Sequence, residues 1–401
     1  MQRYLLDELI ESAQTKIVML VLDGLGGLQR EPGGPTELEC ARTPALDALA
    51  RASELGLTLP VAAGISPGSG PGHLALFGYD PIENPIGRGA MEALGTDFEL
   101  GPSDLAARGN FCTVDGQGQL IDRRAGRIPT ELNRELCALL ETIQLDGVQI
   151  FLRPVKDHRF ALVLRGPGLG EALTESDPQQ TGVPASAVRS LAPGSDEAAR
   201  LVGRFIESAR RLLADRTPAN MILLRGFAAS PVLPGFLERY RLKAAAIAVR
   251  GMYRGVARLV GMRVLDLGGE TLDDEFAALE THWHEADFFY LHVKQTDTAG
   301  ELGDFDGKVR AIEEVDARLP RLLALRPDVV VIGGDHSSPA ILRSHSWHPV
   351  PLLLHSRSAR AGVSSGFGEG ACARGSLGFL RATDVMPLAL AHAGRLAKYG
   401  A

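Results

Sequence analysis

A series of short, uninterrupted apolar runs, each followed by glycine or a polar side chain, most constrains how this chain can fold. The run Ile17–Leu22 is apolar at every position and ends in Asp23-Gly-Leu-Gly-Gly27. Such a run is typical of a strand that is buried on both faces, as in a parallel sheet. Similar runs are found at Met221–Leu224, Ala244–Val249, Phe288–Val293, Val329–Ile332 and Val350–Leu354.

Helical stretches separate several of these runs, for example Pro44–Ala52 and Lys308–Leu325. Alternation of buried strands with helices predicts an α/β fold, with a doubly wound, mostly parallel sheet that carries helices on both faces. Ligands of such sheets bind beyond the carboxyl ends of the strands. The residues that follow each run are therefore the first candidates for a functional site.

The middle of the chain has a different pattern. Short strand candidates surround one predicted helix, Thr130–Glu141, which indicates a separate α+β unit with proline and glycine in its connections. The strand candidates are Asn110–Val114, Gln119–Asp122, Gln149–Phe151 and Phe160–Leu164. We expect residues 1–86 and 235–401 to form a metal-binding core, and residues 87–234 to form an inserted cap domain that binds substrate.

Composition narrows the classes of function. The 401 residues carry a net charge of -7 without a long run of like charge, which argues against a nucleic-acid partner. Ile17–Leu22 is too short to span a membrane, and the acidic residues before it do not form a secretory signal. Four scattered cysteines are typical of a reducing compartment, so we expect a cytoplasmic protein without a membrane partner. An oligomer is compatible with this sequence.

Histidine and aspartate gather at the predicted strand ends. Seven of the ten histidines lie between His282 and His355. Four segments offer oxygen or nitrogen ligands, and together they could hold two divalent metals roughly 3.5–4 Å apart. The alternative for each residue is a helix cap or an ordinary core or surface side chain. For His292, alternation along its strand predicts burial behind the site. The segments contain Asp23, Asp297 with Glu301, Asp335 with His336, and His345 with His348.

The segment Gly64–His73 is a glycine-rich turn that leads into a helical stretch. Gly64-Ile65-Ser66-Pro67-Gly68 matches the G-x-S-x-G nucleophile motif, but Pro67 lacks the N–H that its oxyanion hole requires. Ser69 lies where the helix begins, so amide groups and the helix dipole could hold a phosphate beside its hydroxyl. Ser69 is therefore the candidate nucleophile, with a plain helix cap as the alternative interpretation.

Taken in order, these motifs resemble the archaeal-type, cofactor-independent phosphoglycerate mutases of the alkaline phosphatase superfamily. The resemblance spans nearly the whole chain. It rests on Val21–Gly27, Arg42–Leu46, Pro67–Ser69, His73–Pro81, Gly87–Ala93, Gly109–Asp115, Asp122–Ile128 and Gly334–Ser337.

The resemblance implies an enzyme that interconverts 3-phosphoglycerate and 2-phosphoglycerate without bisphosphoglycerate as a cofactor. It implies that Ser69 becomes phosphorylated at a centre of two divalent metals. One metal would be held by Asp23, Ser69, Asp335 and His336, and the other by Asp297, Glu301 and His345.

The substrate would be a small phosphorylated hydroxy acid, whose anionic groups suit guanidinium side chains. Asp122 is a candidate acid or base for the glycerate hydroxyls. The candidate substrate-binding arginines are Arg123, Arg124, Arg127, Arg159, Arg225 and Arg254.

The chain departs from the family pattern at four positions. Glu301 stands where the family usually has histidine, which favours manganese or magnesium over zinc. Gly70 and Gly72 replace aspartate and alanine, and Gln179 replaces a histidine. These changes keep two alternatives open: a phosphohydrolase or phosphotransferase of the same superfamily, and a non-catalytic paralogue that binds a metabolite.

Overall fold

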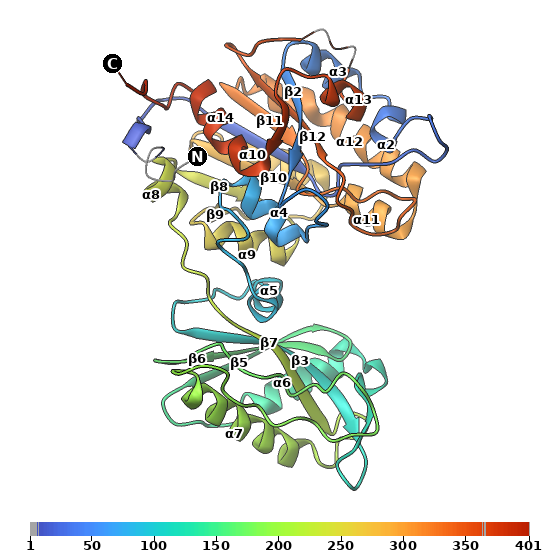
Figure 1. Ribbon diagram of the computed structural model, residues 1–401, viewed down its shortest axis with the longest axis vertical. Helices are drawn as coiled ribbons and strands as arrows, with labels where there is room; N and C mark the ends of the chain where they lie inside the picture. Colours follow the sequence, from blue (N-terminus) through green and yellow to red (C-terminus); the bar gives the residue numbers. More distant parts are fainter. Residues whose placement is uncertain (1–5, 7, 363, 365, 401) are drawn as a thin grey trace. The chain divides into compact units, whose positions relative to one another are not determined.

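The computed structural model describes residues 6, 8–362, 364 and 366–400 (Figure 1). The chain separates into two compact units. The larger unit combines Met1–Pro85 with Leu233–Ala401, and the smaller unit is Ile86–Val232.

An eight-stranded sheet forms the centre of the larger unit, and seven of its strands run parallel to one another. The α/β class with a mostly parallel sheet is therefore confirmed. The exception is β12, which we expected among the parallel strands but which runs antiparallel to both neighbours. No helix lies between it and β11, whereas parallel strands are usually joined by a helical crossover. The order is β13 (Gly378–Arg381), β2 (Glu54–Leu59), β12 (Val350–Ser356), β11 (Val329–Gly333), β1 (Ile17–Leu22), β10 (Phe288–Val293), β8 (Ala244–Ile247) and β9 (Arg263–Val264).

Helices pack on both faces of this sheet, as β10 illustrates. Phe289 and Leu291 belong to a core that includes residues of α3, α10 and α12. Alternate residues contact the other helices: the Phe288 ring lies 4.9 Å from Phe236 of α8, and the His292 ring lies 3.7 Å from Tyr253 of α9. No helix of the described residues has the length and apolar character needed to cross a membrane. The helices are α2 (Glu37–Cys40), α3 (Pro44–Arg51), α4 (Ser69–Leu76), α8 (Phe236–Tyr240), α9 (Gly251–Leu259), α10 (Leu272–Thr281), α11 (Gln295–Leu302), α12 (Phe305–Ala324), α13 (Glu369–Ala373) and α14 (Val385–His392).

The smaller unit contains an antiparallel five-stranded sheet. Its order is β4 (Leu120–Asp122), β3 (Asp104–Val114), β6 (Arg159–Arg165) and β5 (Gln149–Lys156), with β7 (Met221–Ala229) paired to β3. Residues of α6 (Thr130–Leu140) and α7 (Asp196–Leu213) share one core with it, while Ala93 of α5 (Arg88–Leu94) belongs to a second. Our placement of Met221–Leu224 in the parallel sheet was wrong, because a short apolar run indicates burial but does not specify the partner strand.

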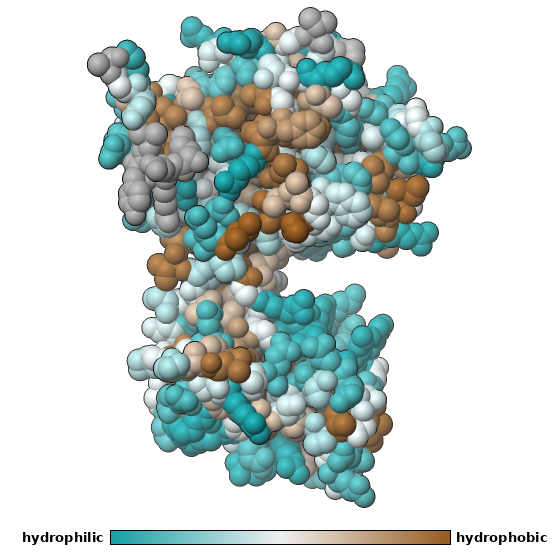
Figure 2. Space-filling view, in the orientation of Figure 1, coloured by the Kyte–Doolittle hydropathy of each residue, from teal (hydrophilic) through white to brown (hydrophobic). Residues whose placement is uncertain are grey.

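The surface of the smaller unit is mostly hydrophilic on the face shown in Figure 2. The side chains of Phe111, Phe160 and Phe205 are fully buried in the core that the sheet shares with α6 and α7. This unit therefore has a complete hydrophobic core of its own, as expected of a separate domain.

Glu275 of α10 is a buried carboxyl group in the larger unit. Its side chain is 1% exposed, and Oε2 has no hydrogen-bond partner among the described residues. Burial, with a smaller contribution from Asp274, raises the pKa of Glu275 to about 8. Because the pKa in the folded state exceeds that in the unfolded state, unfolding releases a proton, and stability falls as the pH rises from about 4.5 to about 8.

We expect Glu275→Gln to remove this loss and to raise the free energy of unfolding above pH 8 by more than about 1 kcal/mol. Urea unfolding at several pH values between 5 and 9 would measure the free energy of unfolding of both proteins. Glu238→Gln, at an exposed position on α8, is the control and should leave the pH profile unchanged. Parallel profiles for wild type and Glu275→Gln would contradict the prediction.

Candidate metal centre and active site

Three acidic side chains meet at the carboxyl ends of neighbouring strands. Asp23 directly follows β1, Asp335 follows β11 after Gly334, and Asp297 lies in the first turn of α11 after β10. Since β1 pairs with both β10 and β11, its neighbours deliver their carboxylates to the same edge. All three side chains are fully buried.

A first cluster forms around the imidazole of His336. Its Nε2 lies 3.2 Å from Asp23 Oδ1, 3.2 Å from Asp335 Oδ2 and 3.1 Å from Ser69 Oγ. Asp23 Oδ1 and Asp335 Oδ2 are buried but accept no hydrogen bond among the described residues. Buried oxygens rarely stay unsatisfied, and oxygens that converge with an imidazole nitrogen form a donor set suited to a divalent cation.

Ser69 reaches this cluster because it is the first residue of α4. Its carbonyl oxygen lies 2.8 Å from Nδ1 of His73, which in turn is 3.1 Å from Asp335 Oδ2. The helix also packs against the backbone after β11, since a Cβ atom on Gly72 would lie 2.3 Å from the Asp335 carbonyl oxygen. Gly72 thus permits the close approach that brings the serine to the carboxylates.

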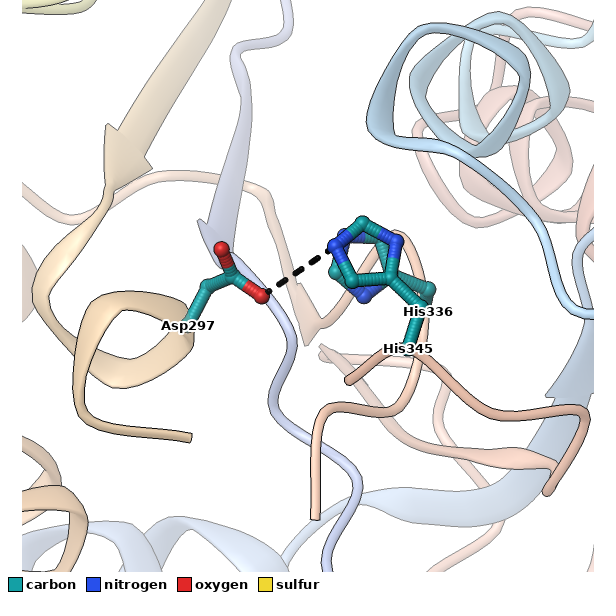
Figure 3. Close-up of side chains that lie close together, drawn as sticks. All are labelled: Asp297, His336 and His345. Atoms are coloured by element: carbon teal, nitrogen blue, oxygen red, sulfur yellow. Dashed lines mark ion pairs between the residues drawn. The ribbon is translucent and has the colours of Figure 1, made fainter. Parts of the chain in front are cut away.

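A second cluster joins Asp297, His336 and His345 (Figure 3). Nε2 of His345 lies 3.6 Å from Asp297 Oδ1, and the two imidazole rings stack with centroids 3.6 Å apart. Nδ1 of His345 is 2.9 Å from the Pro67 carbonyl oxygen. A proton on Nδ1 would be donated there, leaving Nε2 with its lone pair toward the cluster.

Glu301 lies at the rim of this second cluster. Its Oε1 is 3.5 Å from His345 Nε2, and its side chain is 55% exposed. We expected Glu301 to complete the second cluster with Asp297 and His345, but the third member is His336. His336 therefore belongs to both clusters. His348 belongs to neither group, and its Nδ1 instead lies 3.0 Å from Ser346 Oγ.

Lys294, which we did not expect at the site, places its ammonium group between two of the carboxylates. Its Nζ is 2.5 Å from Asp297 Oδ2 and 3.4 Å from Asp23 Oδ2. Burial opposes the charge, but the carboxylates of Asp23 and Asp297 raise the pKa of Lys294. Its position in the sequence, directly after β10 and three residues before Asp297, could have indicated that Lys294 lies at the site.

We also expected strand alternation to bury His292 behind the site. His292 is buried, at 1% exposed, and belongs to neither ligand group, and its Nε2 lies 2.9 Å from Asp23 Oδ2. Burial alone would raise the pKa of Asp23, but the hydrogen bond from His292 and the neighbouring imidazole of His336 hold it well below its ordinary value. For His336, burial opposes protonation, yet the carboxylates of Asp335 and Asp23 raise its pKa to about 9. The edge of the sheet is thus strongly negative, as a cation site requires.

The smaller unit contains a basic cavity of about 470 Å³. Of the six arginines expected to bind substrate, five line it, and Arg254 lies on α9 of the larger unit. Burial and the nearby Arg159 lower the pKa of His158 to about 4, so this imidazole is neutral at pH 7. The cavity is lined by Arg123, Arg124, Arg127, Arg159 and Arg225 and by six residues that we did not predict for this role, Arg108, Asn110, Lys156, Asp157, His158 and Gln179.

Two acidic residues hold the loop 122–127, which carries three of the arginines of this cavity. The carboxylate of Asp122 accepts hydrogen bonds from the amides of Arg124 at 2.8 Å and Gly126 at 2.6 Å. Asp177 binds Arg123 through two hydrogen bonds of 2.9 and 2.7 Å, which raise the pKa of Arg123. The fold therefore holds the guanidinium group of Arg123 and the backbone at Arg124 and Gly126.

The fold defines an α/β protein with clustered carboxylates, imidazoles and a serine at its strand ends. The family described as 2,3-bisphosphoglycerate-independent phosphoglycerate mutase matches residues 50–220. A protein of Thermus thermophilus named "Probable 2,3-bisphosphoglycerate-independent phosphoglycerate mutase" is 51% identical over 99% of this chain and 98% of its own. A protein of the same name from Thermosipho africanus is 50% identical over 99% of this chain and 98% of its own. The chain belongs to this family of enzymes.

Two solved structures are similar over nearly the whole chain. The cofactor-independent phosphoglycerate mutase of Thermoplasma acidophilum is 28% identical, with a TM-score of 0.79 over 95% of this chain and 100% of that chain. A protein of Pyrococcus horikoshii is also 28% identical, with a TM-score of 0.80 over 97% of this chain and 100% of that chain. The fold described above is thus that of a known phosphoglycerate mutase.

The backbone segments that carry the first cluster pack directly against each other. Leu25 and Gly26 form isolated bridges with Ser337, and a Cβ atom on Gly26 would lie 1.9 Å from Ser337 Oγ. This spacing leaves no room for a methyl group.

We expect Gly26→Ala to lower the free energy of unfolding by about 1–3 kcal/mol, because one segment must shift. Gly203→Ala is the matched control, since its Cβ would meet no atom within 4 Å on α7 and should stabilise the helix by about 0.5–1 kcal/mol. Calorimetry of both variants tests the prediction, and an unchanged transition for Gly26→Ala would refute it.

Proposed function

We propose that this chain interconverts 3-phosphoglycerate and 2-phosphoglycerate through a phosphoserine at Ser69, beside two divalent metal ions. The observation that carries the proposal is the convergence of Ser69 Oγ with His336 Nε2 and two unsatisfied carboxylate oxygens. A serine hydroxyl needs such an environment before it can act as a nucleophile.

We assign one ion to Asp23, Asp335 and His336 together with Ser69. The other ion would be held by Asp297 and His345, within reach of Glu301 at the rim. Three buried carboxylates favour a hard ion, so manganese or magnesium suits the centre better than zinc. When bound, the ions would offset the carboxylate charge, lower the pKa of the serine hydroxyl and stabilise charge on the transferring phosphoryl group.

In the proposed reaction, Ser69 Oγ forms a bond to phosphorus as the bond from phosphorus to the 3-oxygen of the substrate breaks. The serine proton is transferred, through the site, to the released 3-oxygen, which leaves glycerate. The 2-hydroxyl of glycerate then attacks the phosphoserine, regenerates the Ser69 hydroxyl and yields 2-phosphoglycerate. Lys294, held by Asp23 and Asp297, supplies a further positive charge beside the reacting group.

We assign binding of the substrate anion to the basic cavity of the smaller unit. Nε of Arg225 is buried there without a hydrogen-bond partner among the described residues, as is Nε of Arg108. A carboxylate or phosphate would satisfy such donors. For Asp122, the contacts to Arg124 and Gly126 support a role in shaping this cavity more directly than the acid–base role expected from the sequence.

The central test incubates the protein with Mn²⁺ and 3-phosphoglycerate, without bisphosphoglycerate, and measures both 2-phosphoglycerate and inorganic phosphate. We expect 2-phosphoglycerate to accumulate, and Ser69→Ala to lower the rate by more than about 1000-fold, because it removes the acceptor oxygen. Release of phosphate in place of 2-phosphoglycerate would identify a phosphohydrolase. Full turnover by Ser69→Ala would rule out this serine as the nucleophile.

A second test concerns the metals. We expect the wild-type protein to bind two Mn²⁺ per chain, and Asp335→Asn to weaken at least one site by more than about tenfold, because one charged oxygen is lost. Titration calorimetry with Mn²⁺ measures both quantities. Asp215→Asn, an exposed position in the smaller unit, is the control. Unchanged binding by Asp335→Asn would exclude this residue as a ligand.

A third test addresses the basic cavity. We expect Arg225→Gln to raise KM for 3-phosphoglycerate by about 10–100-fold, the value of one charge-assisted hydrogen bond, with a smaller effect on kcat. Arg204→Gln, an exposed arginine of α7, should match wild type. An unchanged KM for Arg225→Gln would contradict the assignment of this cavity to the substrate.

A further inference from the structure

We infer that Lys308 is a positioning residue of the metal centre, which sets the spacing of the metal ligands although it contacts neither metal nor substrate. The inference rests on the proposed function, because it assumes that the clusters described above bind metal. It concerns a buried charge that the proposed reaction does not use.

Lys308 lies on α12, and its side chain is fully buried. Its ammonium group donates hydrogen bonds to the carbonyl oxygens of Gly24 at 2.8 Å, Gly26 at 2.9 Å and Ser338 at 2.9 Å. An ammonium has three N–H donors, so these bonds satisfy all of them. One side chain thus joins the segment after β1 to the segment after β11.

Two acidic side chains bind the amides of the same segments. The carboxylate of Glu37, also fully buried, accepts from the amides of Leu28 at 2.9 Å and Ala340 at 2.8 Å. Glu369 accepts from the amide of Gly27 at 2.9 Å. The lysine therefore holds carbonyl groups, and the two glutamates hold amide groups, of the segments that follow β1 and β11.

These segments carry the candidate ligands. The amide of Gly24, next to Asp23, donates to Asp335 Oδ1 at 3.1 Å. Oγ of Ser338, the residue whose carbonyl binds Lys308, donates to Asp297 Oδ1 at 2.5 Å and lies 3.2 Å from His336 Nδ1. A shift of either segment would consequently move ligands of both clusters.

Packing alone does not account for a lysine at this position. Burial of an ammonium costs several kcal/mol, and an apolar residue of similar size would avoid that cost. The apolar residue would, however, remove the donor to the Ser338 carbonyl and leave the Gly24 and Gly26 carbonyls with the shared amide of Ser338, which lies 3.2 and 3.0 Å from them. We therefore assign the buried charge to fixing the distance between the segments.

The test compares Lys308→Met with wild type by Mn²⁺ titration calorimetry and by the electron paramagnetic resonance spectrum of the bound Mn²⁺. We expect Mn²⁺ affinity to fall by at least about tenfold, as for other residues that orient metal ligands, and the spectrum to show altered ligand geometry. Circular dichroism must show that the variant is folded.

Lys16→Met is the matched control. Nζ of Lys16 also donates to a backbone carbonyl, that of Ala286 at 2.6 Å, but at the opposite end of β1. This variant should lose stability while keeping the Mn²⁺ affinity and spectrum of wild type. If both lysine variants weaken Mn²⁺ binding equally, the effect reflects general destabilisation and the inference fails.

Glu37→Gln provides a second variant if Lys308→Met does not fold. In glutamine one of the two accepting oxygens becomes an NH₂ group, which cannot accept, so one of the two Glu37 contacts is lost, and we again expect weaker Mn²⁺ binding with an altered spectrum. Wild-type affinity and spectrum in a folded variant, Lys308→Met or Glu37→Gln, would overturn the inference. Absence of Mn²⁺ binding by the wild type would instead overturn the proposed function.

Discussion

The larger unit depends on the burial of three like charges at one edge of its sheet. Asp23, Asp297 and Asp335 are fully buried at the ends of adjacent strands, where their mutual repulsion and desolvation oppose folding. The chain offsets this cost with Lys294 and with imidazoles such as His336. Even so, two carboxylate oxygens accept no hydrogen bond among the described residues, and the proposed cations would satisfy them.

The position of β1 explains why this arrangement can form. A central strand with parallel neighbours on both sides brings three chain segments, more than 300 residues apart in sequence at the extreme, to one edge. Beyond that edge the strand pairing is reduced to isolated bridges, such as those of Leu25 and Gly26 with Ser337, and side chains from the flanking helices bind further backbone groups of the loops. Lys308 and Glu37 do this from α12 and α2, which makes the helices on one face part of the support for the site.

The sequence predicted the strand ends well, because a fully apolar run that stops at a charged residue is typical of a buried strand reaching the edge of its sheet. Asp23 and Asp335 were identified in this way, and the fold brings them together. The sequence did not predict that Met221–Leu224 joins the other sheet, since strand partners depend on tertiary pairing. Lys294 and Lys308 were missed because a lysine in a sequence is usually exposed, and only the fold reveals that these two side chains turn inward.

The two candidate metal clusters differ in their access to solvent, and this difference follows from the elements that build them. The carboxylates and the imidazole of the first cluster, Asp23, Asp335 and His336, follow strand ends and are fully buried. The second combines buried Asp297 with His345 from a loop, and Glu301 at its rim is more than half exposed. Because an exposed carboxylate can exchange with water at little cost, we expect an ion in the second cluster to be held less tightly.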